Sequence, residues 1–385
     1  MISFQFNTTR SIINEPGAIK RLGEICASHN ISRPLIITDQ GIVEIGLLER
    51  LQSRLTTAGI PYACYCGVVA DPPERVVLEA LAQAKAEAVD GVIGFGGGSS
   101  MDTAKLVALM SRSGECLESI YGVDKAKGER LPLIQIPTTA GTGSEVTGVA
   151  IVTTGETTKA GVLAAQLLPD VAILDAELTL DLPAHITAAT AIDAMVHAIE
   201  AFTSVHKKNA YSDMLAREAL SHLSANITVA THHGNDIEAR QAMLYGACLA
   251  GQAFANAPVA AVHALAYPLG GFYHIPHGLS NSLVLPYVLR FNAQSAGQHY
   301  QDIARYILPA KDQNIRADNA ADKLADYFLA LASDLGLPTR LRDAEVTESS
   351  LPMLAEAAML QQRLLINNPR EVSLQDVLEI YQQAY

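Results

Sequence analysis

The sequence has few cysteines. Its five cysteines are an odd number, and none stands in a C-x-x-C pair. Disulfide frameworks and zinc knuckles are built from regularly spaced cysteines, so neither is expected. Cys64 and Cys66 alternate in PYACYCGVV, which indicates one face of a strand. We interpret them as small buried side chains in a reducing cytoplasm.

Positive charge is also scarce. The 385 residues include 27 basic and 40 acidic ones, a formal net charge of −13. Such a surface would repel nucleic acid and anionic membranes, so neither is expected as a partner. An anionic cofactor stays open, because the backbone N–H groups of a loop bind phosphate whatever the net charge.

Long hydrophobic runs are missing as well. No window reaches the roughly 18 uninterrupted apolar residues of a membrane-spanning helix, and MISFQFNTTRSIINEPG lacks a basic segment followed by an apolar one. We therefore expect a soluble, cytoplasmic protein. Hydrophobic residues make up 49% and charged ones 17%, which excludes disorder. The length favours two domains, because one core rarely grows past about 250 to 300 residues.

The pattern of the chain changes near residue 180. Before it, short apolar runs alternate with helical spacing, which is typical of a parallel sheet covered on both faces. The predicted strands are 34–39, 62–69, 90–97, 131–139 and 171–177, and the predicted helices are 42–59 and 73–89. After LPAHIT, Ala-rich stretches predict helices at 188–204, 209–233 and 236–256. We expect an α/β domain over 1–180, an all-helical domain over 181–385, and a ligand in the cleft between them.

A glycine-rich loop follows one predicted strand. In VIGFGGGSSMDTAK, the strand runs into Gly96 to Gly98 and then into a helix that Ser99 can cap and that carries Asp102 and Lys105. Such a loop forms an anion cradle at a helix N-terminus. The pattern matches neither G-x-G-x-x-G nor the Walker motif, so a plain strand-to-helix turn stays the alternative.

A second polar loop repeats this arrangement. IPTTAGTGSEVT follows another strand and offers the hydroxyls of Thr138, Thr139, Thr142 and Ser144. Its alternative is a Ser/Thr-rich connection. Two such loops at the carboxyl ends of strands in one sheet are expected where a nucleotide binds. Asp39, which closes PLIITD, can accept ribose hydroxyls and would repel a 2′-phosphate, which favours NAD over NADP; alternatively it caps the next turn.

Four residues of the second half form a candidate metal site. Asp193 and His197 are four apart on a predicted helix, so both project from one face. His263 lies in an apolar helix, and His277 follows Ile-Pro in a loop that returns from two glycines toward the same helix end. Metal binding is not the only interpretation of these residues. Asp193 and His197 could form a hydrogen bond within or on the surface of their helix, and His263 could be an ordinary histidine of the core. Together, one carboxylate and three imidazoles suit Fe²⁺ or Zn²⁺ rather than Ca²⁺ or Mg²⁺.

The four motifs GGGSSMDTAK, IPTTAGTGSEVT, AATAIDAMVHAIEAF and HALAYPLGGFYHIPHGLSNSLVLP stand in the order found in iron-containing (group III) alcohol dehydrogenases. From the strand ending at Asp39 to about residue 292, the sequence resembles that family. The resemblance implies an α/β N-terminal Rossmann-like domain plus an all-α C-terminal domain, the dehydroquinate synthase-like architecture, in a homodimer. It also implies a metal-dependent, NAD(P)-linked dehydrogenase or reductase acting on small alcohols and aldehydes.

By position in the motifs, the resemblance assigns Fe²⁺, with Zn²⁺ as the alternative, to Asp193, His197, His263 and His277. The family's cofactor contacts fall on Asp39, Gly96, Gly97, Gly98, Ser99, Ser100, Thr138, Thr139, Lys159 and Leu178. His274 matches no ligand, so we assign it to the wall of the substrate pocket or to the surroundings of the metal.

Two positions depart from the family pattern. Many members have a proline where this chain has Ser100, a change that a helix start tolerates. Many alcohol-active members have a second histidine four residues after His263, proposed to relay protons, where this chain has Tyr267. A tyrosine, with a pKa near about 10, titrates less readily than a histidine near about 6.5. Tyr267 therefore either links a proton chain or packs among its apolar neighbours.

The physical case for a dehydrogenase is that hydride transfer to or from nicotinamide C4 needs an oriented cofactor and a Lewis acid at the substrate oxygen. Tyr267 leaves open two relatives on the same fold, maleylacetate reductase and hydroxyacid–oxoacid transhydrogenase. Both act on carboxylated substrates and would need a basic pocket residue, which the sequence does not place. A lyase resembling dehydroquinate synthase is disfavoured because that family has glutamate in place of Asp193. A non-catalytic nucleotide sensor is disfavoured because all four ligand positions are filled.

Overall fold

The computed structural model describes residues 3–155 and 158–385 and divides the chain into two units. The α/β unit is Asn7–Leu182, and the helical unit is Pro183–Tyr385 with the N-terminal residues up to Phe6. The sequence predicts that the N-terminus belongs to the α/β domain over 1–180. In the helical unit, the rings of Phe4 and Phe6 lie 5.7 Å and 5.6 Å from that of Tyr211, which accounts for the grouping.

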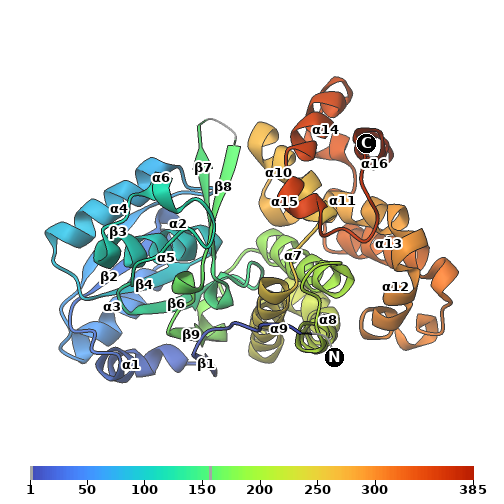
Figure 1. Ribbon diagram of the computed structural model, residues 1–385. Coiled ribbons are helices and arrows are strands. Elements are labelled where there is room, and N and C mark those ends of the chain that lie inside the picture. The colour runs from blue at the N-terminus through green and yellow to red at the C-terminus, as the bar shows by residue number, and fades with distance from the viewer. Residues whose placement is uncertain (1–2, 156–157) are drawn as a thin grey trace. The chain divides into compact units, whose positions relative to one another are not determined.

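Six parallel strands form the central sheet of the α/β unit, in the order β1-β9-β6-β4-β2-β3 (Figure 1). They are β1 (Ser11–Asn14), β2 (Pro34–Asp39), β3 (Ala63–Val68), β4 (Gly91–Gly96), β6 (Leu133–Pro137) and β9 (Val171–Leu174). All five predicted strands are present. The sixth, β1, escaped prediction because its four residues form only a short, half-exposed run.

Helices cover both faces of this sheet. On one face, Leu35 and Ile37 of β2 belong to a buried apolar cluster that includes α4 (Glu74–Ala86) and α5 (Gly98–Ser113). Residues that point to the opposite face form a second cluster, which includes Ile36 of the same strand. Alternate side chains of a strand point to opposite faces, so double coverage explains why the strand sequences are apolar throughout.

The second face is covered by shorter helices. They are α1 (Leu22–Ser28), α2 (Gln40–Glu44) and α3 (Leu47–Thr57). The predicted helix 42–59 is divided between α2 and α3 because Gly46 adopts a left-handed φ of 77°. The predicted helix 73–89 corresponds to α4.

The α/β unit also has a small second sheet that the sequence did not predict. It consists of β7 (Val149–Thr154), β8 (Thr158–Leu163) and β5 (Gly122–Val123), in the order β5-β8-β7, with β7 and β8 antiparallel. Figure 1 shows β7 and β8 as a hairpin. A short helix, α6 (Leu117–Ile120), precedes β5.

Cys64 and Cys66 lie on one face of β3, as predicted, with their Sγ atoms 3.3 Å apart. Both are half-buried rather than buried. The reason is the place of β3, which is the edge strand of the six-stranded sheet and is therefore covered less completely than the central strands.

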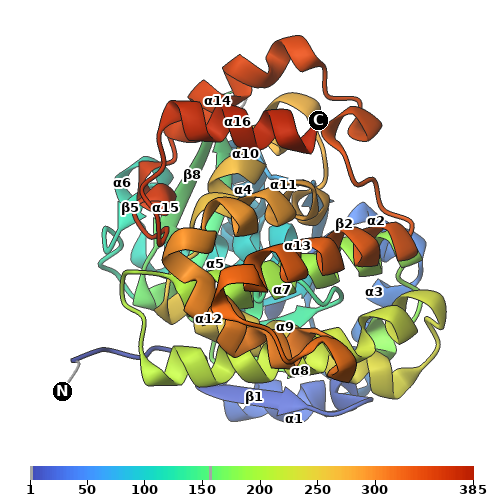
Figure 2. The same cartoon turned by 90° about the vertical axis from the view of Figure 1, so that its right-hand side faces the viewer.

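The second unit is built from helices (Figure 2). They are α7 (Ala184–Thr203), α8 (Ala210–His232), α9 (Ile237–Asn256), α10 (Ala261–Tyr273), α11 (His277–Phe291), α12 (Ala293–Ile307), α13 (Ala317–Asp334), α14 (Leu351–Met359), α15 (Gln362–Leu365) and α16 (Leu374–Ala384). The three helices predicted from the sequence correspond to α7, α8 and α9. Nearly all of α7 is buried, including two acidic residues. Buried carboxylates require partners, so α7 is where the unit's polar chemistry is expected.

These two architectures, a parallel sheet with helices on both faces and an all-helical unit, confirm the predicted fold class. Among the described residues, single helices fall short of the length and apolar character that crossing a membrane requires. One bent pair, α9 with α10 at 107°, meets the test by length and composition only.

Candidate metal centre and dinucleotide site

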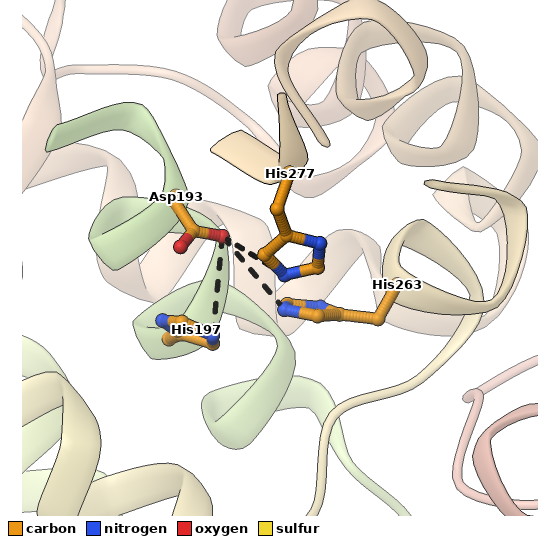
Figure 3. Close-up of side chains that lie close together, drawn as sticks. All are labelled: Asp193, His197, His263 and His277. Atoms are coloured by element: carbon orange, nitrogen blue, oxygen red, sulfur yellow. Dashed lines mark ion pairs between the residues drawn. The ribbon is translucent and has the colours of Figure 1, made fainter. Parts of the chain in front are cut away.

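The four predicted metal ligands lie together in the helical unit. Asp193 and His197 come from α7, His263 from α10 and His277 from the first position of α11, and their side chains converge in Figure 3. One donor atom of each residue lies within 4.8 Å of the others. The Oδ1 atom of Asp193 is 3.9 Å from the Nε2 atom of His197, 3.9 Å from that of His263 and 3.7 Å from that of His277.

The close approach of α11 to α7 depends on Gly278. A Cβ atom at this position would lie 2.4 Å from the carbonyl oxygen of Ala189 in α7, a backbone atom that cannot move aside easily. Any side chain would therefore push α11 away. The glycine next to His277 brings this imidazole within reach of Asp193.

The turn before His277 differs from the prediction. The sequence predicts His277 in a loop that returns from Gly270 and Gly271, but both glycines lie inside α10, which continues to Tyr273. His274 ends the helix by adopting a left-handed φ of 54°. The connection is thus a short turn, and His277 is held on a helix rather than on a loop.

The charges of this group are strongly coupled because it is buried. Asp193 is 1% exposed and His263 is 2% exposed, whereas the side chain of His277 is 31% exposed. Burial acts to raise the pKa of Asp193, but the three imidazoles and a hydrogen bond from Asn281 outweigh it, so this pKa lies below its usual range. The carboxylate is therefore ionised and ready to bind a cation.

The residues present fit a divalent transition metal. One carboxylate oxygen and three imidazole nitrogens converge, which is a donor set suited to Fe²⁺ or Zn²⁺. The ring of His197 stacks on the ring of Phe254, at 4.3 Å between centroids, and on that of His263, at 4.7 Å. These two contacts hold the His197 ring in place beside the other donors. The exposed side of His277 leaves an approach for a small molecule.

Two buried residues that we did not select from the sequence contact the candidate ligands. The Oε2 atom of Glu200 is 2.6 Å from the Nδ1 atom of His263. The Nδ2 atom of Asn281 donates to Asp193 Oδ1 at 2.6 Å. Helical periodicity was the available signal, because Glu200 follows Asp193 by seven residues and Asn281 follows His277 by four.

Tyr267 lies beside this group, one turn after His263 on α10. Its ring centroid is 5.9 Å from that of His277. The guanidinium of Arg363, from α15, lies over the Tyr267 ring at 5.9 Å from its centroid. His274 is exposed at the end of α10, and the structure does not bring it into the group of four.

In the α/β unit, several of the predicted cofactor residues lie at the carboxyl ends of neighbouring strands. Strands β2, β4 and β6 are neighbours, and their carboxyl ends lead into Asp39, the glycine loop and Thr138. The Ser100 hydroxyl donates to Asp39 Oδ2 at 3.1 Å, and the Thr138 N–H donates to the Gly96 carbonyl at 3.0 Å. Gly96 has a φ of 145°, and a Cβ there would lie 2.8 Å from Ser100 Oγ, so the loop requires glycine.

The start of α5 corrects one expectation. Ser99 was expected to cap this helix, but the helix begins at Gly98 and the cap residue is Gly97. A glycine has no side chain with which to satisfy the first-turn N–H groups. Within the described part of the chain, these groups therefore stay available to an anion, as a phosphate cradle requires.

Asp39 has the structural role that we kept as its alternative. Its Oδ1 atom accepts a hydrogen bond from the Ile42 N–H at 3.1 Å and so caps α2. Each carboxylate oxygen carries a second lone pair, so capping leaves room for a ribose hydroxyl. Lys159, on β8, pairs with Asp71 at 2.5 Å, and Leu178 is 2% exposed within the second apolar cluster.

Lys105 does not point into the anion cradle. It is fully buried, and its Nζ atom donates to Ser144 Oγ at 2.7 Å, to Thr147 Oγ1 at 3.1 Å and to the Val149 carbonyl at 2.6 Å. Asp102, at 3.4 Å from Nζ, also accepts from Ser144. We call these five residues the Lys105 network. It ties the helix after the first glycine loop to the second loop.

Comparison with known proteins covers both units. Residues 9–176 match the model of the family described as iron-containing alcohol dehydrogenase, and residues 187–385 match the Fe-containing alcohol dehydrogenase family, C-terminal. Long-chain-alcohol dehydrogenase 1 of Geobacillus thermodenitrificans (strain NG80-2) is 40% identical over 370 residues, which cover 95% of this chain and 91% of that protein.

Solved structures are similar over the whole length. A 1,3-propanediol oxidoreductase has a TM-score of 0.95 and 33% identity, with all of both chains covered. A sulfoacetaldehyde reductase from Bifidobacterium kashiwanohense, in complex with NAD⁺, has a TM-score of 0.89 and 28% identity, covering 100% of this chain and 99% of that one.

Proposed function

The chain belongs to the iron-containing alcohol dehydrogenase family, and on this premise we propose which of its residues hold the metal, the cofactor and the substrate. It is a metal-dependent oxidoreductase that interconverts alcohols and carbonyl compounds with a nicotinamide cofactor. The observation that carries the proposal is the convergence of one carboxylate and three imidazoles in the buried core of the helical unit.

We assign the metal, Fe²⁺ with Zn²⁺ as the alternative, to Asp193, His197, His263 and His277. When bound, such an ion supplies Lewis acidity to the oxygen of the substrate. The protein's own contribution is to hold the four donors rigidly, by the buried position of α7, the stacking of His197 and the close contact at Gly278. The partly exposed edge of His277 gives the substrate access.

The test of this assignment removes one imidazole at a time. His263→Ala and His277→Ala are each expected to lose bound metal and turnover together, measured by elemental analysis and by the absorbance of NADH. His222→Ala serves as the control, because His222 is paired with Glu218 on α8 and belongs to no ligand group. Stoichiometric metal retained in either site variant would reject the assignment.

We assign the dinucleotide to the carboxyl ends of β2, β4 and β6 in the six-stranded sheet. The residues proposed to contact it are Asp39, Gly96, Gly97, Gly98, Ser99, Ser100, Thr138, Thr139, Lys159 and Leu178. The first-turn N–H groups of α5 suit a pyrophosphate, and the Asp39 carboxylate favours NAD over NADP because it would repel a 2′-phosphate. The NAD⁺ complex of the similar sulfoacetaldehyde reductase supports this choice. Asp39→Ser is expected to raise the use of NADPH relative to NADH.

A second candidate substrate class is favoured by Arg363. The first is a small neutral alcohol or aldehyde, as in the similar propanediol oxidoreductase. The second is a carbonyl compound that carries a carboxylate or sulfonate, which needs a cation near the site. Arg363 lies over the ring of Tyr267, and this ring also lies beside that of the candidate ligand His277. In a chain with a net charge of −13, this cation is well placed to attract an anionic substituent.

The two substrate classes are separated by a pair of matched aldehydes. For Arg363→Gln, kcat/KM for sulfoacetaldehyde should fall by about tenfold or more, the loss expected for one charged hydrogen bond, while 3-hydroxypropanal changes by less than about twofold. Arg305→Gln is the matched control, because Arg305 is also exposed and lies over a tyrosine, Tyr306, at 5.1 Å. Equal changes for both aldehydes would reject the anionic class.

Two further residues are proposed near the substrate. We propose that Tyr267 either passes a proton through its hydroxyl or packs against the site. We propose that His274 forms part of the wall of the substrate pocket. For His274→Ala, we expect a change in KM without loss of metal. We also propose a homodimer in the cytoplasm, which sedimentation of the purified protein and fractionation of cells would test.

A further inference from the structure

Glu200 is a buried carboxylate outside the group of four proposed ligands. Its side chain is 4% exposed, and it lies on α7, which also carries Asp193 and His197. An ionised carboxylate in such a place is costly unless its oxygens accept hydrogen bonds. Glu200 makes three: it accepts from the N–H of Ala260 at 3.0 Å and from the N–H of Val262 at 2.7 Å, and its Oε2 atom shares the third with His263 Nδ1 at 2.6 Å.

Two of these hydrogen bonds satisfy the start of α10. The first N–H groups of a helix have no partner within the helix, and the cap residue here, Ala260, has no polar side chain. Glu200 takes the place of a capping side chain from a neighbouring helix, and its charge matches the positive end of the helix dipole. It thereby fixes where α10 begins and so where His263 stands.

The third hydrogen bond bears on the tautomer of the imidazole. A carboxylate oxygen accepts hydrogen bonds, so Glu200 Oε2, at 2.6 Å from Nδ1, stabilises the His263 tautomer that has its proton on Nδ1. Its Nε2 atom then keeps its lone pair, and this atom is the one that lies 3.9 Å from Asp193 Oδ1. A carboxylate on the far nitrogen also makes the imidazole a stronger electron donor.

We propose that Glu200 is a positioning residue of the metal site, which holds His263 in the orientation and tautomer that bind the ion. The proposal rests on the ligand set assigned above. It also explains the spacing on α7, since Asp193, His197 and Glu200 follow one another by four and three residues and share one face. This one helix supplies two donors directly and orients a third.

The test measures metal binding rather than turnover. Metal-stripped protein is titrated with Co²⁺ against a competing chelator, at a temperature below the unfolding transition of every variant. Glu200→Leu removes all acceptors and should weaken Co²⁺ binding by about 10- to 100-fold. Glu200→Gln keeps an acceptor but loses the charge, and should weaken binding by less. Both should shift the absorption bands of bound Co²⁺, which a residue that only caps α10 would not do.

The nitrogen chemical shifts of ¹⁵N-histidine provide an independent readout. In the metal-stripped wild type, His263 should be the Nδ1–H tautomer, and in Glu200→Leu it should be a mixture. Glu218→Gln is the matched control, because Glu218 also pairs with a histidine, His222, at 3.2 Å but far from the ligands in the chain. This control should bind Co²⁺ like the wild type.

The outcomes separate this inference from the ligand assignment. If His197→Ala loses Co²⁺ while both Glu200 variants bind it with wild-type affinity and unchanged spectra, the role of Glu200 is rejected and the ligand set stands. If His197→Ala binds Co²⁺ normally, the ligand set itself is wrong. Should Glu200→Leu fail to fold, the affinity, spectrum and tautomer of Glu200→Gln decide the question.

Discussion

The two units bury charge in opposite ways. In the α/β unit, the cation of Lys105 is fully buried, but hydroxyl, carbonyl and carboxylate oxygens of the same unit surround it. In the helical unit, the carboxylate of Asp193 is equally buried, and the nitrogens of three imidazoles face it. Both groups direct several electron-pair donors toward one point, but in the first that point already holds a cation of the chain itself, the Nζ atom of Lys105.

This contrast shows what distinguishes a structural network from a ligand site. Burial acts to lower the pKa of Lys105, and Asp102 and Glu145 act to raise it, with burial the larger effect. The Lys105 network contains its own cation and needs nothing from outside. The group around Asp193 is electron-rich, so an external cation completes it. The balance of donors and acceptors, rather than burial alone, indicates function.

The largest effect should come from removing the charge at the centre of the helical unit. Asp193→Asn keeps the size of the side chain but loses the anion, so we expect the metal to be lost and turnover to fall by about a thousandfold or more, the effect of several kcal/mol at the transition state. Metal content and NADH-linked turnover measure this. If Asp193→Asn kept a full complement of metal and nearly normal turnover, the buried charge of the helical unit would not be a ligand site and would not differ in role from that of the α/β unit.

Breaking the network in the α/β unit should lower stability and leave the metal in place. Lys105→Met deletes the buried cation and leaves its partners unsatisfied, so the free energy of unfolding should fall by about 3 to 5 kcal/mol. NADH should also bind more weakly, because the two loops are no longer tied together. Denaturant titration, NADH titration and metal analysis report the three quantities.

A lysine at the surface gives the control for this variant. Lys20 pairs with Glu177 while 57% exposed, so Lys20→Met should change stability by at most about 1 kcal/mol. If Lys105→Met lost its metal at a temperature where the variant is folded, metal binding in the helical unit would depend on the Lys105 network of the α/β unit.

The buried carboxyl of Glu145 gives a dependence on pH. Burial raises the pKa of Glu145 to about 7, from an ordinary value of 4.5. The folded protein therefore holds this proton more tightly than the unfolded chain does. Protonated Glu145 therefore contributes on the order of 3 kcal/mol to the free energy of unfolding. This contribution is complete below about pH 4.5 and is lost as pH rises to about 7. Glu145→Gln should flatten this part of the unfolding free energy. Parallel curves for variant and wild type would contradict the assignment.

Tyr267→Phe should have the smallest effect. The ring keeps its contacts with His277 and Arg363, and only the hydroxyl is removed. If the side chain mainly packs, as these ring contacts favour, aldehyde reduction should stay within about twofold of wild type, with the same pH profile. A loss of about a hundredfold or more, with a changed profile, would instead assign the hydroxyl to proton transfer.

The sequence predicted those residues that belong to short local patterns, such as an apolar run or a helical spacing. Apolar runs located β2, β4 and β6, and the spacing of Asp193 and His197 placed both on one helical face. The hairpin of β7 and β8 was missed because Thr, Lys and Gly interrupt its apolar pattern. The N-cap of α5 was predicted at Ser99, two residues after its actual position at Gly97, because serine is commoner than glycine at helix N-caps.

By itself, the sequence determined the two kinds of architecture, the family and the four residues that meet in the helical unit. These follow from periodicity and from ordered motifs, which are properties of neighbouring residues. Tertiary structure alone decided that Lys105 turns inward, that Glu200 orients His263 and that Arg363 lies over Tyr267. Each of these contacts joins residues far apart in the chain. Their meeting depends on how whole helices and strands pack, which no local spacing records.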